Sequence, residues 1–344
     1  MRFWRHARVL AGVLLTALLA MPGQAPAAED VEAEYEAGNW GTEFTFGLNL
    51  LQSYYTENWN GGDKGSVVWT SQLDGLAKKR LSDDLSFTGT LNLAFGQTHQ
   101  QEREDDSDEL YWRRPDKTTD EIRSELLLRY LRSALDPFVS VRFESQFIDQ
   151  TDPRRDFTLN PLEFYETVGI SRQLIADDER QLLARLGFTL HQSVRDIYLG
   201  ADTVESESTN DGGIELIFDY RSKYFDDAVD YVGELRFYQP VYYSAKSDIE
   251  DLDAAVLVAA GLDADLADHT TTLDIDFKNH FTAHITDVIN VQLLMRWVYD
   301  KYDNTVPLLL TDGGDIENPE AVAAAVRKSG QFKQTMSLGV AYTF

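Results

Sequence analysis

The sequence predicts an all-β protein, an antiparallel up-and-down transmembrane β-barrel of about 12 strands. Its last segment, 334–344, alternates apolar residues with small or polar ones and ends in an aromatic residue. This period of two is typical of a strand with lipid on one side. Earlier segments alternate in the same way, and the connections between them are short and long in turn. Outer-membrane barrels have short periplasmic turns and longer extracellular loops, whereas nothing in a soluble β-sandwich would gather the long loops at one end.

The composition agrees with a barrel and excludes several other classes of protein. Aromatic residues make up 12% of the 344 residues, which suits a barrel with aromatic girdles at the membrane interfaces. The mean hydropathy of -0.34 excludes a bundle of spanning helices, which need runs of about 20 apolar residues. The chain has no cysteine, so a disulfide scaffold and a thiolate–metal site are excluded.

The net charge of -27 argues against nucleic acid as a partner, because phosphates are bound by Lys and Arg. Two interpretations of this acidity remain open. Acidic loops would keep the protein soluble in transit to the membrane. Alternatively, an acidic mouth would concentrate cations or bridge to a charged outer leaflet through divalent ions.

The first 27 residues read as a signal peptide that is cleaved. A basic start with Arg2, Arg5 and Arg8 precedes an apolar run, 9–21, and the small residues at 25–27 form a cleavage site. Residues 28–42 are then a periplasmic tether, which could instead fold into the lumen, and 43–344 form the barrel.

Alternation places the strands in chain order. We expect them at 43–51, 66–77, 85–95, 120–131, 139–147, 162–173, 182–191, 214–221, 231–237, 273–278, 289–299 and 334–344. Short turns are expected at 81–84, 134–137, 176–179, 225–227 and 285–287. Longer loops are expected after the first strand and at 99–118, 148–160, 193–211, 244–268 and 302–330.

Two of the long loops are expected to hold a short helix. In 244–268, Asp248 or Ser247 would cap the helix and Gly261 would end it. In 302–330, Asn318 would be the N-cap, with Pro319 at the first helical position.

Charged residues of both signs fall on the face of the strands opposite the lipid. The candidate lumen charges are Arg142, Glu144, Arg185, Glu215, Asp219, Arg221, Glu234, Arg236, Asp274, Asp276 and Arg296, and Arg123, Glu125 and Lys278 share their pattern. Buried charges are costly unless they are paired and hydrogen-bonded. One interpretation is therefore a structural network of ion pairs that fills the interior. The other is a narrow hydrated path lined by charge.

The segment after the first strand is distinctive, with Gln52, Asn58, Trp59, Gly61 and Gly62. It resembles an uncharacterised family of Gram-negative envelope proteins, domain of unknown function 3078. The likeness continues at 117–120, 145–147, 159–161 and 338–344. This resemblance implies an outer-membrane barrel and brings no known activity. In physical terms the two glycines allow a tight turn, so the motif is either a hairpin cap at the barrel mouth or a platform for a ligand.

No catalytic constellation is evident, and we expect no enzyme, cofactor or metal site. A barrel lipase would need a Ser nucleophile beside a His base, and no sequence pattern supports one. His280 and His284 would lie about 13 Å apart on one strand, too far to share a metal. The acidic residues at 248–253 lack the glycine and the final Glu of a calcium loop.

The working function is an outer-membrane, porin-like barrel that forms a narrow pore or takes part in transport. The alternatives are a structural or surface-interaction barrel without conductance and an outer-membrane lipid-modifying enzyme. Expected partners are outer-membrane lipid, lipopolysaccharide and the barrel assembly machinery, which would read Tyr342 and Phe344 at the end of the chain. A small solute or cation is a further candidate.

Overall fold

The structure is a computed structural model that describes residues 39–55, 64–104, 110–131, 135–151, 155–177, 179–199, 203–311 and 313–343. The predicted signal peptide lies outside the described residues, as do most of the tether and Asn58, Trp59, Gly61, Gly62 and Phe344. The first strand begins at Trp40, inside the range expected for the tether. Within the described residues, none of the helices combines the length and apolar character that a membrane crossing needs.

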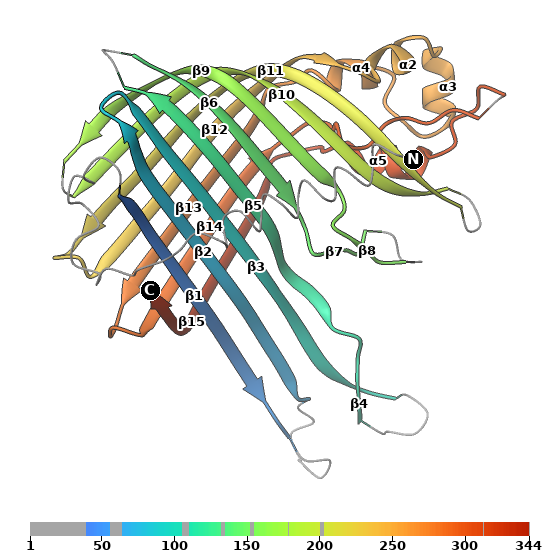
Figure 1. Cartoon of the computed structure of the whole chain (residues 1–344). Helices are drawn as coiled ribbons and strands as arrows, with labels where there is room; N and C mark the ends of the chain where they lie inside the picture. Colours follow the sequence, from blue (N-terminus) through green and yellow to red (C-terminus); the bar gives the residue numbers. More distant parts are fainter. Residues whose placement is uncertain are drawn as a thin grey trace.

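Twelve long antiparallel strands close into a barrel, which confirms the predicted fold (Figure 1). They are β1 Trp40–Ser53, β2 Ser66–Ser82, β3 Leu85–Arg103, β5 Asp116–Tyr130, β6 Asp136–Ser145, β9 Leu162–Ala176, β10 Arg180–Leu199, β11 Thr203–Tyr224, β12 Val229–Tyr243, β13 Asp274–His284, β14 Ile289–Tyr299 and β15 Gln331–Thr343. Each pairs with its neighbours in chain order, and β1 pairs with β15. Three short strands lie outside the barrel wall: β4 Leu110–Trp112 pairs with the end of β3, and β7 Ile148–Asp149 pairs with β8 Phe157–Thr158.

The outer wall of the barrel is apolar, as the closing strand shows. Met336, Leu338 and Val340 alternate along β15 and are 73%, 65% and 53% exposed. Phe332 and Tyr342 lie at the two ends of this stripe, ten residues apart, which is roughly 33 Å along a strand. At the 35–45° tilt of membrane barrels, this length gives an apolar band about 25 Å tall, the height of the band in outer-membrane barrels.

Aromatic side chains gather at both edges of the band. Towards the outer edge, Phe277, Trp297 and Phe332 are register partners on β13, β14 and β15. Towards the periplasmic edge, Tyr231 packs against Tyr220 and Phe281 with ring centroids 5.7 Å and 4.6 Å apart. Rings at both edges are the girdles that the aromatic content predicts.

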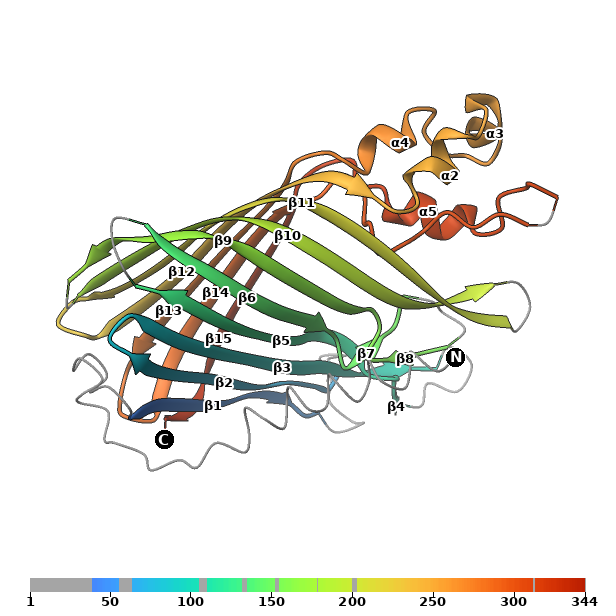
Figure 2. The ribbon, with the colours of Figure 1, turned by 45° about the horizontal axis from the view of Figure 1, so that its top comes forward.

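The expected loop at 193–211 is wrong, because strands β10 and β11 continue through it. Their pairing runs without interruption from Arg180 opposite Ser222 to Leu199 opposite Thr203. This hairpin extends beyond the other strands, as Figure 2 shows. Residues 203–210 are mostly polar on both faces, so the apolar alternation that predicts a strand is missing there. A hairpin exposed to water needs no apolar face, since its ladder satisfies the backbone groups.

The loops after β12 and β14 pack together into an outer cap. The cap holds α2 Lys246–Glu250, α3 Ala254–Ala259, α4 Leu266–His269 and α5 Pro319–Ala325, which lie together at one end of the barrel in both views (Figures 1 and 2). Its buried core consists of Tyr243, Ala245, Ile249, Leu257, Leu262, Leu266, Tyr302, Val306, Leu308, Val322 and Ala325. Arg195 of the long hairpin reaches Asp303 and Thr305 at 3.3 Å and 2.7 Å, so the cap is fixed to the inner face of β10.

The predicted helix caps need correction. The loop predicted to hold one helix holds three short ones, α2, α3 and α4. Asp253, and not Asp248 or Ser247, caps α3 by accepting a hydrogen bond from the backbone N–H of Ala255. Gly261 follows α3 with a φ of 79°, as expected for a residue that ends a helix. Asn318 is the N-cap residue of α5, but its side chain bonds the backbone of Leu309 and Pro307 instead of the helix.

The seam between the first and last strands is short. The β1–β15 register runs only from Thr45 opposite Thr343 to Leu48 opposite Val340, whereas β1 pairs with β2 along its whole length. Beyond the seam the two strands diverge towards their outer ends (Figure 2). Leu50 on the diverging part of β1 is 62% exposed. The barrel is therefore closed at its periplasmic half and splayed at its outer half along this edge.

Two pairs of cysteines test the seam in a chain that has no cysteine of its own. Phe46→Cys with Tyr342→Cys replaces register partners, so a disulfide is expected to form on oxidation. Leu50→Cys with Leu338→Cys is the matched control. This pair would meet only if the same register continued outwards, and it is expected to stay reduced. Gel mobility with and without reductant reports the result, and equal cross-linking of both pairs would contradict the splayed seam.

Candidate functional site

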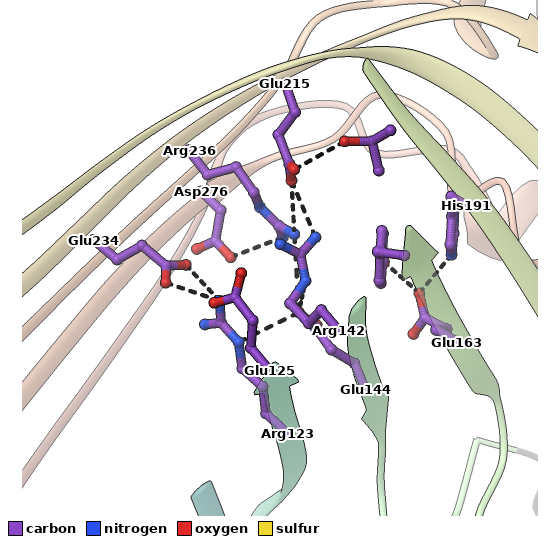
Figure 3. Close-up of polar contacts among 12 residues, drawn as sticks. Arg123, Glu125, Arg142, Glu144, Glu163, His191, Glu215, Glu234, Arg236 and Asp276 are labelled. Atoms are coloured by element: carbon purple, nitrogen blue, oxygen red, sulfur yellow. Dashed lines mark hydrogen bonds and ion pairs between the residues drawn. The ribbon is translucent and has the colours of Figure 1, made fainter. Parts of the chain in front are cut away.

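The interior of the barrel holds neighbouring groups of ion pairs, here together called the lumen network. Its cations are Arg123, Arg142, Arg185, Arg236, Lys278 and Arg296, and its anions are Glu121, Glu125, Glu144, Glu215, Asp219, Glu234 and Asp276. Figure 3 shows the part of it that includes Arg123, Arg142 and Arg236. The period of two explains the arrangement. Residues that alternate with lipid-facing ones on β5, β6, β10, β11, β12, β13 and β14 all point inwards.

Several pairs cross the lumen from one side to the other. Lys278 on β13 places its Nζ 3.2 Å from Glu121 Oε1 on β5. These strands are six places apart around the ring of twelve in either direction, so they are opposite each other. Arg123 on β5 donates to both carboxylate oxygens of Glu234 on β12, at 3.0 Å and 2.8 Å. The two contacts bridge the lumen across its width.

Arg142 is the most enclosed member of the network, with 2% of its surface exposed. Its Nη2 donates to Glu215 Oε1 at 3.1 Å, and its Nε lies 2.9 Å from Glu144 Oε1. The guanidinium also stacks 4.2 Å above the ring of Tyr165. Glu215 accepts a further hydrogen bond at 3.0 Å from Thr189, so both members of this pair are held by neutral groups as well.

Two other members of the network each bind two partners. Arg185 contacts Glu125 at 2.5 Å and Asp219 at 2.9 Å, and Asp276 accepts from Arg296 at 2.7 Å. Asp276 also lies 3.3 Å from Arg236, whose side chain comes within 3.9 Å of two more carboxylates. Every charge in this part of the lumen therefore has an opposite charge beside it, which removes most of the cost of its burial.

A second polar group lies nearer the outer mouth. His191 Nδ1 is 2.7 Å from Asp211 and its Nε2 is 3.2 Å from Glu163, while its ring stacks on Tyr165 at 4.2 Å. Tyr238 donates a hydrogen bond to the other oxygen of Asp211. Because Tyr165 also touches Arg142, this group is continuous with the lumen network (Figure 3).

The structure brings most of the predicted lumen charges together, with two exceptions. Arg221 is exposed near the periplasmic end of β11, and no ion pair among the described residues includes it. Asp274 lies at the outer end of β13, beside Asp300. Of the other predicted positions, Gln52 lies near the outer end of β1, and Tyr342 is on the lipid-facing side of β15.

The sequence analysis did not identify Glu121, Glu163 or Tyr165 as lumen residues, nor the contacts that His191 makes with its neighbours. Alternation could have found the first three, since Glu121 shares its face with Arg123, and Glu163 and Tyr165 share theirs with inward residues of β9. Alternation along β10 places His191 on the same inner face as Arg185 and Thr189, but it does not identify the partners of the ring. Its partners come from strands β9 and β11 on either side, and only the strand register places them beside it.

Asp300, in the loop after β14, is expected to make the stability of the folded barrel depend on pH. Burial and the nearby charge of Asp303 raise the pKa of this carboxyl to about 7, against the opposing effect of Arg327. Asp274 and Glu163 also face it. A raised pKa in the folded state means that the group favours folding at low pH and that this contribution is lost as the pH rises through about 7.

Asp300→Asn is therefore expected to raise the unfolding temperature at pH 8 and to raise it clearly less at pH 5, because the contribution of the carboxyl is lost progressively between pH 3.8 and about 7. The amide stays neutral and keeps the oxygen that accepts from the backbone N–H of Tyr302. Loss of heat-modifiable gel migration, measured at both pH values, reports the unfolding temperature. Asp315→Asn, at an exposed position of the cap, is the control. An equal gain at both pH values would contradict the assignment.

Comparisons with known proteins place the chain in no family. No family model matches it, and no curated protein matches its sequence. The resemblance to domain of unknown function 3078 therefore stays a prediction.

Among solved structures, the chain is similar to an outer membrane channel from Pseudomonas putida F1, with 14% identity, 93% of this chain and 99% of that chain covered, and a TM-score of 0.38. It is also similar to the translocator domain of the autotransporter NalP from Neisseria meningitidis, with 9% identity, coverage of 99% and 97%, and a TM-score of 0.35. A mutant of the Rh. blastica porin gives 7% identity, coverage of 89% and 100%, and a TM-score of 0.22. Because these TM-scores are low, the proposals below depend on the strand pairing and contacts of this chain.

Proposed function

We propose that the chain is an integral outer-membrane β-barrel that forms a narrow pore, held nearly closed by the lumen network. Membrane residence is supported by the closed barrel, the exposed apolar stripe of β15 and the aromatic rings at both edges of the band. The even strand number and the short turns at one end fit the outer membrane of a Gram-negative bacterium.

The main support for a pore is that the side chains that meet across the lumen are charged and not apolar. Apolar residues of similar volume often make a buried region as stable as ion pairs do, or more stable. A permanently sealed barrel would therefore have no need of so many charges. Charged side chains that bridge the lumen by their tips can separate and admit water, whereas a packed apolar core cannot open without leaving voids.

The outer mouth suits small cations more than anions. Above the network, Glu163, Asp211, Asp300 and Asp303 lie on the inner side of the mouth, where His191 faces Glu163 and Asp211, and Arg195 faces Asp303. These four carboxylates outnumber the two basic side chains beside them, and an excess of carboxylates raises the local concentration of cations. The substrate class that we propose is accordingly a small cation or a small solute that carries positive charge.

Planar bilayer recordings test this proposal with the purified protein. Wild type is expected to give rare current steps of small conductance, with a reversal potential that favours K⁺ over Cl⁻ in a KCl gradient. Deletion of 247–266 is not a suitable variant, because Ile249, Leu257 and Leu262 belong to the core of the cap. Absence of steps both in wild type and in a variant without a bridging pair would contradict the pore.

A barrel without conductance that acts through its outer surface is the second candidate. The cap supports it, because two long loops build a hydrophobic core of their own and are attached to the hairpin of β10 and β11. A binding surface needs a rigid support of this kind. Silent bilayers together with a correctly folded barrel would favour this role.

A further inference from the structure

A buried histidine of the cap lacks the hydrogen bonds that its position requires. His269, the last residue of α4, has 9% of its surface exposed. Its Nδ1 is buried and has no hydrogen-bond partner among the described residues. Buried polar groups are nearly always paired, so an unpaired ring nitrogen calls for a ligand or another explanation.

Two carboxylates face the two nitrogens of this ring at distances too long for hydrogen bonds. Asp263 Oδ2 is 3.9 Å from Nδ1, and Asp265 Oδ1 is 3.6 Å from Nε2. One ligand atom from each of the three residues can be chosen so that all lie within 4.8 Å of one another. Two ligands bound to one ion by bonds of about 2.0–2.1 Å are separated by roughly 3–4 Å, so the gap between Asp263 and the unpaired Nδ1 suits a metal ion. One ion binds only one nitrogen of an imidazole, because the two lone pairs point apart, so Asp265 joins as the third ligand by turning from Nε2 towards this ion.

The local fold holds the three groups in place. Leu266 is fully buried in the core of the cap, which anchors the single turn of α4. Asp265 and His269 are four residues apart and lie on the same face of that turn. Asp265 is the N-cap residue of α4, but its side chain makes no capping hydrogen bond, so its carboxylate is free to bind.

We propose that Asp263, Asp265 and His269 bind a divalent transition-metal ion such as Zn²⁺. An imidazole beside two carboxylates favours Zn²⁺ and its neighbours over Ca²⁺ and Mg²⁺, which prefer oxygen ligands alone. With three protein ligands and both carboxylates reached by solvent, water completes the coordination. The bound ion ties the segment before α4 to the end of that helix and stiffens the cap. This site is independent of the proposed pore.

Isothermal titration of chelator-treated, detergent-solubilised protein with ZnCl₂ tests the site. Wild type is expected to bind one equivalent of Zn²⁺, and MgCl₂ is expected to give no comparable heat. His269→Gln is expected to weaken Zn²⁺ binding at least tenfold, because the one nitrogen ligand is lost. Asp268→Asn, which removes one negative charge from the same helix without removing a proposed ligand, is the control for net charge and is expected to bind as wild type does.

Asp265→Asn keeps the proposal testable if the buried His269 cannot be changed without unfolding the cap. This position is exposed, so its replacement leaves the core intact and is expected to weaken Zn²⁺ binding as well. Equal affinity of wild type, His269→Gln and Asp265→Asn would show adventitious binding to the acidic surface and would overturn the site. Equal weakening by Asp268→Asn would overturn it too, since the effect would then come from net charge.

Discussion

Arg142→Ala is expected to destabilise the barrel by about 3–5 kcal/mol, the usual cost of removing one member of a buried ion pair. The change leaves Glu215 buried and Glu144 partly buried, with Arg236 at 3.9 Å from each and Arg123 at 3.6 Å from Glu144. It also removes the stack on Tyr165. Arg142→Lys keeps the charge but not the planar fork that reaches two carboxylates, so its effect should fall between alanine and wild type.

The temperature at which heat-modifiable migration is lost measures this effect. Arg221→Ala is the control, because Arg221 is exposed near the end of β11 and lies outside the network. Exposed positions of this kind usually change stability by less than about 0.5 kcal/mol. If Arg142→Ala and Arg221→Ala unfold at the same temperature, the lumen is hydrated enough to screen its charges, and the closed network is wrong.

Lys278→Glu is expected to weaken the barrel and to increase ion flow, and Glu121→Lys in the same chain is expected to reverse both effects. The single change sets two carboxylates against each other across the lumen, where Lys278 and Glu121 now meet at 3.2 Å. A loss of ~2 kcal/mol is typical of a change that breaks one such contact in a partly solvated site. The double exchange restores a pair of the same combined length between β13 and β5.

A double-mutant cycle separates this contact from general charge effects. Unfolding temperature and bilayer conductance are measured for wild type, Lys278→Glu, Glu121→Lys and the exchanged pair. Recovery in the exchanged pair shows that the two side chains meet. Additive losses would mean that they do not, and would place β5 and β13 further apart than the structure has them.

The barrel could be predicted from the sequence because each strand carries its own pattern. Alternation such as Met336, Leu338 and Val340 against Ser337 and Gly339 identifies both the strand and its lipid face without reference to any other strand. Turns were predictable for the same local reason, as at Phe225 to Asp227, where positive φ values follow from a tight connection. The order of the strands then follows from short links between neighbours.

The lumen network could be predicted only in part, because its pairs are not local. Alternation shows that Arg123 and Lys278 point inwards. The neighbouring sequence does not identify their partners, which lie more than 100 positions away. The pairing of the last strand with the first follows from an up-and-down barrel, but the short length of the seam could not be predicted, for a related reason. Pairing of β1 with β15 depends on how the whole ring closes, so the divergence after Leu48 has no signature in either strand. The proposed metal site could not be predicted from the sequence, because His269 becomes buried only when the two loops of the cap pack together.

Single-channel conductance with a bridging pair removed tests most directly whether the lumen network closes the barrel. Arg123→Ala with Glu234→Ala deletes both ends of one cross-lumen contact, and so shortens two side chains without changing the net charge. The account predicts current steps several times larger than those of wild type, from protein that still migrates as a folded barrel. Steps of unchanged size, or silence in both proteins, would contradict it.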